Sequence, residues 1–271
     1  MPAIEKIYIA RHGFRVNWVT SNWTSPTGLP KDPPLTVFGV EQAKELGDFF
    51  LSLPEDERPT AIFSSPYYRC LQTAQPVAVA LGLPLYVEHG ISEWYSPVAP
   101  GTGLHPRPQS ATVLQTYFKE IDPSWSSVWY PTRKGEDVDE VHERTDGFLK
   151  TFIPKVERQF GHRHQRILLV SHAATVITLA RVLTGDMQLP LRVGCCSLSE
   201  FVRSSNDDVT GSWDAKRLAQ GDHLKDGALR DWGLEDIRIA DGKVIDDPGI
   251  PGTENEVETH FGRCPTLSSN L

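Results

Sequence analysis

The sequence predicts an α/β protein, a three-layer α/β/α sandwich with a mainly parallel central sheet and loop or helix insertions. Two observations predict it. Short apolar runs alternate along the chain with longer segments of helical periodicity, which is typical of a parallel sheet covered by helices on both faces. Polar motifs follow directly after three of these runs, as binding loops do at the carboxyl ends of parallel strands.

The first predicted elements are two strands with an insertion and a helix between them. Ile4–Ala10 is apolar and β-branched and is predicted to be a buried strand. Residues 14–35, with four prolines and one glycine, form a long irregular insertion of the length usual for a lid. Thr36 can cap a helix that extends to about Leu53. Ala61–Phe63 is the second predicted strand.

The remaining elements continue the alternation. We expect a helix from about Tyr67 that is kinked at Pro76, then a strand at 85–87 and an insertion at 96–135 with one short helical pattern at 111–120. A helix at 136–160, a strand at 166–170 and a helix that ends near 183 follow. The last expected element is a half-exposed strand at 197–202 that could be antiparallel. One domain over 1–271 is therefore expected, with the insertions near 14–35 and 96–135.

Charge is unevenly distributed along the 271 residues. The formal net charge is −8, but residues 1–203 hold 20 basic and 21 acidic side chains, whereas residues 204–271 hold 7 and 14. We expect an acidic C-terminal extension from about residue 204. An acidic chain argues against nucleic acid or an anionic membrane as the main partner.

Cysteine usage and the N-terminus bear on the compartment. The four cysteines are too few and too scattered for a disulfide framework, which favours reduced thiols and a cytoplasmic or nuclear location. The N-terminus has charges at Glu5 and Lys6 and no long apolar run, so no signal peptide is expected. Polar residues interrupt the most apolar stretch, 167–183, so no membrane span is expected.

Three motifs that follow predicted strands contain the candidate chemistry. They are Arg11-His12-Gly13, Ser64–Arg69 and Ser171-His172-Ala173. A parallel sheet can bring such loops together at one edge. Arginine binds the oxygens of a phosphoryl group in pairs, and a neutral imidazole is a competent nucleophile. The motifs therefore predict a site for an anion.

These motifs resemble those of the histidine phosphatase, or phosphoglycerate-mutase-like, superfamily. The resemblance covers about residues 4–200 and rests on four segments in the family's order: Ile7–Gly13, Pro34–Ala43, Ser64–Ala74 and Val170–Ala174. It implies that His12 is the nucleophile and forms a phosphohistidine. It further implies that Arg11 and Arg69 bind the phosphoryl oxygens and that His172 completes the pocket.

The physical chemistry agrees with these implied roles. A histidine attacks only when neutral, and two neighbouring guanidiniums should hold the pKa of His12 below about 6.5. The same arginines would stabilise the transferring phosphoryl group. The scheme requires no metal and no cofactor.

Glu93, in Gly90–Tyr95, is the candidate proton donor, because apolar neighbours could raise the pKa of its carboxyl group. The Gly-x-x-Glu-Trp pattern resembles the branch that contains the T-cell ubiquitin-associated tyrosine phosphatases, and Arg15 matches an extra phosphate-side arginine of that branch. A solvated loop carboxylate and a plain lid salt bridge are the alternative interpretations of these two residues. Asn17, Trp94 and Tyr95 are candidate pocket residues, whereas residues 26–34 are expected to be a lid without chemistry of their own.

The leading hypothesis is a metal-independent phosphomonoesterase for a small phosphorylated substrate or phosphopeptide, such as a phosphotyrosine-like or other aryl phosphate. The sequence also resembles a fungal group that includes the phosphatase-like subunit of the RNA polymerase III transcription factor complex. A scaffold that binds transcription-factor subunits is therefore an alternative. Because the chain ends in a polar, acidic tail without a long partner helix, we expect a free-standing relative. A phosphoglycerate-type mutase and a sensor without turnover are less favoured, and the oligomeric state is left open.

Overall fold

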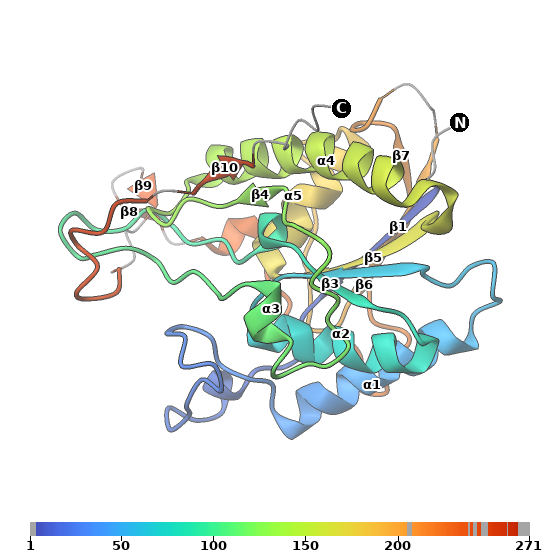
Figure 1. The fold of residues 1–271 in the computed structure, drawn as a ribbon, viewed down its shortest axis with the longest axis horizontal. Coiled ribbons are helices and arrows are strands. Elements are labelled where there is room, and N and C mark those ends of the chain that lie inside the picture. The colour runs from blue at the N-terminus through green and yellow to red at the C-terminus, as the bar shows by residue number, and fades with distance from the viewer. Residues whose placement is uncertain are drawn as a thin grey trace.

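A computed structural model describes residues 4–204, 208–237, 239–240, 243–244, 249–258 and 260–264. A six-stranded sheet in the order β3-β2-β5-β1-β6-β7 forms its centre (Figure 1). The strands are β1 Lys6–Arg11, β2 Ala61–Ser64, β3 Leu85–Val87, β5 Arg166–Ser171, β6 Leu198–Arg203 and β7 Trp213–Gln220. The first four in spatial order are parallel, whereas β6 is antiparallel to β1 and β7 to β6. The mainly parallel sheet is as predicted, and β6 takes the antiparallel direction that the sequence left open.

Helices cover both faces of the sheet, so the three-layer prediction is confirmed. Helices α1 (Val37–Ser52) and α2 (Tyr68–Leu81) lie on one face, and α4 (Val138–Phe160) and α5 (Ala173–Thr184) lie on the other (Figure 1). The short α3 (Ala111–Leu114) lies in the insertion. Short 3-10 turns occupy Val16–Trp18, His89–Ile91, Gly161–Arg163 and Leu234–Asp236. Two small sheets have two strands each. One pairs β4 (Trp129–Tyr130) with β10 (Gly262–Arg263), and the other pairs β8 (Ile239–Ala240) with β9 (Lys243–Val244).

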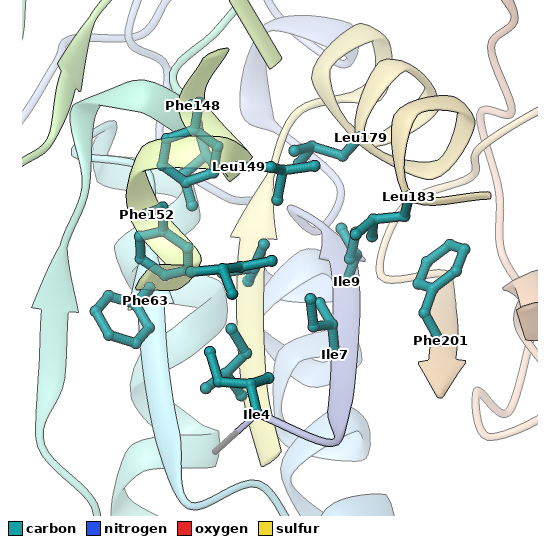
Figure 2. Packing of buried hydrophobic residues seen from close by; sticks show 14 of the residues in the cluster. Ile4, Ile7, Ile9, Phe63, Phe148, Leu149, Phe152, Leu179, Leu183 and Phe201 are labelled. Atoms are coloured by element: carbon teal, nitrogen blue, oxygen red, sulfur yellow. The ribbon is translucent and has the colours of Figure 1, made fainter. Parts of the chain in front are cut away.

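The alternation of side chains along β1 builds two cores. Ile7 and Ile9 face α4 and α5, where they join the buried cluster that contains Phe152 and Leu183 (Figure 2). Tyr8 and Ala10 belong to the cluster on the opposite face, with residues of α1 and α2. Burial of each large apolar side chain contributes roughly 1.5–3 kcal/mol, so both layers anchor the strand whose end leads into the Arg-His-Gly motif.

The beginning of α1 lies against the loop that follows β1. The hydroxyl of Thr36 accepts a hydrogen bond from the backbone N–H of Gly39, so the predicted cap is present. A Cβ on Gly39 would lie 2.2 Å from the carbonyl oxygen of Phe14, and one on Gly13 would lie 2.7 Å from that of Gly39. Both positions need glycine because the two backbones touch.

The chain after residue 204 adds a strand to the sheet, which no pattern in the sequence indicates. β7 pairs with β6 as an edge strand and exposes most of its polar side chains, so it lacks the apolar alternation that reveals a strand. Farther along, β10 pairs with β4, and Ile250 bridges to Leu104 in the 96–135 insertion. All four cysteines are free thiols. No helix in the part of the chain that the structure describes has the length and apolarity to cross a membrane.

Candidate active site

Three parallel strands end at the same edge of the sheet and bring the motif loops together. β1 ends at Arg11, and the backbone N–H of His12 donates a 2.9 Å hydrogen bond to the carbonyl of Ser171, the last residue of β5. The N–H of Ser65, directly after β2, donates to the carbonyl of Val170, also at 2.9 Å. Backbone bonds between neighbouring strands therefore fix the relative positions of the three motifs.

His12 is a buried histidine with a defined hydrogen position. Its side chain is 1% exposed, and Nδ1 lies 2.8 Å from the carbonyl oxygen of Gly13. Since a carbonyl only accepts, Nδ1 has the hydrogen and Nε2 keeps its lone pair. Burial lowers the pKa of His12 well below 6.5, and the charges of Arg69 and Arg11 lower it further. The neutral form needed for nucleophilic attack is thus the resting form.

Three arginines surround the same point. Arg69, fully buried at the start of α2, donates from Nη1 to Asp32 Oδ1 at 3.0 Å and from Nη2 to Glu93 Oε2 at 2.9 Å. Arg11 donates from Nη1 to two backbone carbonyls. The guanidinium of Arg15 lies 4.5 Å from the centre of the Trp18 ring, and its burial, with the charge of Arg69, lowers its pKa to about 10.

The charges at the site favour an anion. Among the described residues, no carboxylate lies within ion-pair distance of Arg11 or Arg15, whereas Arg69 has two. The three guanidiniums are therefore only partly balanced, and a phosphoryl group would supply the missing negative charge.

His172 lies beside His12 with its orientation fixed on both nitrogens. The centres of the two rings are 5.4 Å apart. Arg69 Nη2 lies 3.1 Å from Nδ1 of His172, and Ser65 Oγ lies 2.8 Å from Nε2. Both ring nitrogens of His172 therefore have a polar partner, and the ring is held in place. Burial lowers the pKa of His172 to about 4 despite the nearby charge of Glu93.

Glu93 lies at the site, but the expected direction of its pKa shift is wrong. Its side chain is 18% exposed, and its Oε2 lies 3.3 Å from Nδ1 of His172. Burial alone would raise the pKa of this carboxyl, but the contact with His172 and the charges of Arg69 and Arg15 lower it well below 4.5. Cationic groups rather than apolar ones face the carboxylate, so Glu93 is an anion in the resting site.

A cavity of about 250 Å³ opens over these groups. Its lining comprises Arg11, His12, Arg15, Glu93, Trp94, Tyr95, Ala173, Ala174 and Trp232. Trp94 and Tyr95, two of the candidate pocket residues, are thus in this lining. Asn17 is exposed and is not among the lining residues; it lies in the short 3-10 turn Val16–Trp18, from which Trp18 stacks near His12.

Asp32 also belongs to the site, and no prediction from the sequence names it. It is 1% exposed, pairs with Arg69, and accepts a 2.9 Å hydrogen bond from the backbone N–H of Tyr68 on Oδ2. The preceding Lys31 has a φ of +59°, a left-handed conformation that a lysine rarely adopts. Residues 26–34 therefore do take part in the site. The one signal in the sequence is an acidic residue placed among prolines, next to a motif segment.

The same side chains could be mistaken for a metal centre. His12, Glu93 and His172 each offer one ligand atom, and these atoms lie within 4.8 Å of one another. However, a divalent cation placed there would meet the positive charges of Arg11, Arg15 and Arg69 at short range. The guanidiniums make an oxyanion the better occupant.

The fold and the site define an α/β protein with paired histidines in an arginine-rich anion pocket. A family model described as the histidine phosphatase superfamily, branch 1, matches residues 7–215. The chain belongs to this superfamily. The transcription factor tau 55 kDa subunit of Saccharomyces cerevisiae is 40% identical over 220 residues, which cover 76% of this chain and 49% of that protein.

Two other relatives are phosphatases by name. The ecdysteroid-phosphate phosphatase of Drosophila melanogaster is 26% identical over 250 residues, covering 77% of this chain and 31% of that protein. The ecdysone phosphate phosphatase of Bombix mori, solved with tungstate, has a TM-score of 0.60 and 19% identity over 78% of this chain and 91% of that one. The structural likeness shows the phosphoglycerate-mutase-like fold. The chain spans about half or less of the length of the two curated relatives.

Proposed function

We propose that the chain is a metal-independent phosphomonoesterase that transfers the phosphoryl group to Nε2 of His12 and then to water. The observation that carries the proposal is the state of His12: buried and neutral, with its hydrogen on Nδ1, in a cavity whose lining includes Arg11 and Arg15, with the charge of the buried Arg69 nearby. The two insect relatives named as phosphatases support the reaction class. Phosphotyrosine-like or other aryl phosphates are the proposed substrates, because Trp94, Tyr95 and Trp232 line the cavity.

The reaction has two displacements at phosphorus. In the first, the lone pair of His12 Nε2 forms the N–P bond while the P–O bond to the leaving group breaks, and Glu93 delivers a proton to that oxygen. In the second, Glu93 takes a proton from water as the water oxygen attacks phosphorus and the N–P bond breaks. Arg11, Arg15 and Arg69 stabilise the equatorial oxygens in both steps.

The ionised state of Glu93 determines where the first proton comes from. Since nearby cations hold this carboxyl as an anion, the proton must enter with the substrate, as the monoanion of the phosphomonoester. Phosphomonoesters lose that proton with a pKa of about 6. Inside the site the proton passes to Glu93 and then to the leaving oxygen.

The assay that tests the proposal is hydrolysis of para-nitrophenyl phosphate in the presence of a chelator. We expect turnover that excess chelator does not reduce, and competitive inhibition by tungstate, an oxyanion that the arginines should bind. Activity that disappears with chelator and returns with a divalent cation would contradict a metal-independent mechanism.

The same assay against pH should show an acidic optimum. As pH falls from 8 to about 6, kcat/KM should rise up to tenfold per pH unit, because the reactive monoanion becomes more abundant. Because burial and the arginines lower the pKa of His12, activity should persist well below pH 6.5 before the imidazole is protonated. An acid limb centred near pH 6.5 would contradict the lowered pKa of His12.

Replacing Glu93 with glutamine should affect poor leaving groups far more than good ones. An amide cannot deliver the proton, so we expect kcat/KM for an alkyl phosphate to fall by about 10²-fold or more. For para-nitrophenyl phosphate, whose leaving group needs little protonation, we expect less than about tenfold. The comparison uses kcat/KM because the later hydrolysis of the phosphoenzyme does not contribute to this constant. An equal loss of kcat/KM on both substrates would show that Glu93 is not the acid. Glu93→Asp, which keeps the carboxyl group, is the conservative control.

A second candidate function is that of a transcription-factor subunit. The 40% identity to the tau 55 kDa subunit favours it. The two functions are compatible, because a protein with a working pocket can also bind partner subunits. Co-purification of the tagged chain with other subunits of such a factor would support this role, and a tagged chain that purifies alone under the same conditions would argue against it.

A further inference from the structure

The family match ends at residue 215, yet the chain beyond it returns to the site. Residues 229–236, which we call the return segment, lie beside 193–195. Val193 and Trp232 exchange both backbone hydrogen bonds, at 2.9 and 3.2 Å, and Cys195 donates to the carbonyl of Leu229 at 2.7 Å. The return segment is thus attached to the chain just before β6.

Ion pairs fasten the same segment from outside. Arg192 donates to Asp231 Oδ2 and to Asp236 Oδ2, both at 2.7 Å. Exposed ion pairs contribute little energy one by one, but the guanidinium of Arg192, which also donates to Glu235, holds three carboxylates of one segment at once. The position of the return segment is therefore defined by backbone and side-chain bonds.

The first contribution of the return segment is to the phosphate pocket. Arg230 has a φ of +56°, and its carbonyl accepts a 2.6 Å hydrogen bond from Nη1 of Arg11. The carbonyl of Val193 accepts from the same nitrogen, also at 2.6 Å. Because Nη1 is bonded to both carbonyls, the guanidinium of Arg11 is held in one orientation, and its remaining N–H groups are oriented to bind an oxyanion.

Its second contribution is an aromatic wall. Trp232 lines the cavity together with Trp94, and the centres of their rings lie 6.4 Å apart at 44°. The indole N–H of Trp94 donates to the carbonyl of Glu136 at 2.8 Å, which fixes that ring. Aromatic rings in contact have centroids about 4.5–7 Å apart, so the two indoles already touch and leave no slot between them. They form one continuous apolar surface beside His12 and Arg15.

We infer that the return segment supplies the subsite for the leaving group, with Trp232 as its specificity-determining residue. A flat, apolar group esterified to the phosphate would lie against Trp94 and Trp232, while the phosphoryl oxygens meet the arginines. A small aliphatic leaving group would gain nothing from this wall. The inference rests on the proposed function, because it names the group that departs from the phosphorus.

The test is equilibrium binding of two non-hydrolysable ligands, phenylphosphonate and methylphosphonate, measured by calorimetry on the whole chain. The wild type should bind phenylphosphonate about tenfold more tightly. Trp232→Ala should remove that preference and leave the affinity for methylphosphonate within about twofold. Trp232→Phe, which keeps a flat ring, should retain most of the preference.

Leu234→Ala is the matched control. Leu234 belongs to the same segment and packs on the same core cluster as Trp232, but it does not line the cavity. It should leave the preference for phenylphosphonate intact. Equal affinity of the wild type for both ligands, or an equal loss of both affinities in Trp232→Ala, would overturn the inference. Binding preference without hydrolysis of para-nitrophenyl phosphate would refute the proposed function alone, so the two failures are distinguishable.

Discussion

Replacing His12 with alanine is expected to reduce kcat for aryl phosphate hydrolysis by at least about 10³-fold, because the variant lacks the nitrogen that forms the N–P bond. No neighbouring group can substitute for it. Both nitrogens of His172 already have polar partners, Nε2 with Ser65 Oγ and Nδ1 with Arg69 Nη2. The arginines are unchanged, so the variant should still bind inorganic phosphate with an affinity close to that of the wild type.

His162→Ala is the control for the loss of a histidine, because His162 lies in the exposed turn that follows α4. It should have wild-type activity. A His12→Ala variant that keeps more than a tenth of wild-type turnover would contradict the proposed nucleophile.

Replacing Arg69 with alanine should damage stability as well as activity. Arg69 and Asp32 are both buried, and the loss of one member of a buried ion pair leaves the other charge without compensation. Such losses cost about 3–5 kcal/mol in the free energy of unfolding. Activity should fall with it, because Arg69 also contacts Glu93 and His172. Urea denaturation and the aryl phosphate assay measure the two effects separately.

A second substitution separates the stability effect from the catalytic one. In the Arg69→Ala background, Asp32→Asn removes the uncompensated charge and should restore about 1–2 kcal/mol, while activity stays low. Arg203→Ala is the control, because Arg203 pairs with Glu157 at the opposite end of β1 from the site. It should leave kcat unchanged. Full recovery of activity in the double variant would contradict the role of Arg69 at the phosphoryl group.

The parts of the fold that the sequence predicts are those with strong local patterns. β1 and β5 are continuous apolar runs, and Thr36 precedes a segment of helical periodicity. Each of these elements can therefore be predicted from a short stretch of sequence alone. The motifs after the strands could be placed at one edge because parallel strands leave no other arrangement. β7 could not be found in this way, because an edge strand with mostly exposed polar residues has no periodic signal.

The missed features of the site depend on contacts distant in sequence. Asp32 meets Arg69, 37 residues later, and the Arg230 carbonyl meets Arg11, 219 residues earlier. No local pattern records such pairs. The direction of the Glu93 pKa failed for the same reason: its sequence neighbours are apolar, but its spatial neighbours are cations. Irregular loops gave the poorest predictions because their backbone is determined by these contacts.

The central claim is that Nε2 of His12 becomes phosphorylated during turnover, and rapid-quench mass spectrometry tests it most directly. The Glu93→Gln variant, mixed with para-nitrophenyl phosphate and quenched in alkali, should accumulate the intermediate because the base that activates water is absent. We predict one phosphoryl group on the peptide that contains His12, in the same amount as the first burst of nitrophenol. A burst with His12 unmodified, or with the phosphoryl group on another residue, would contradict the mechanism.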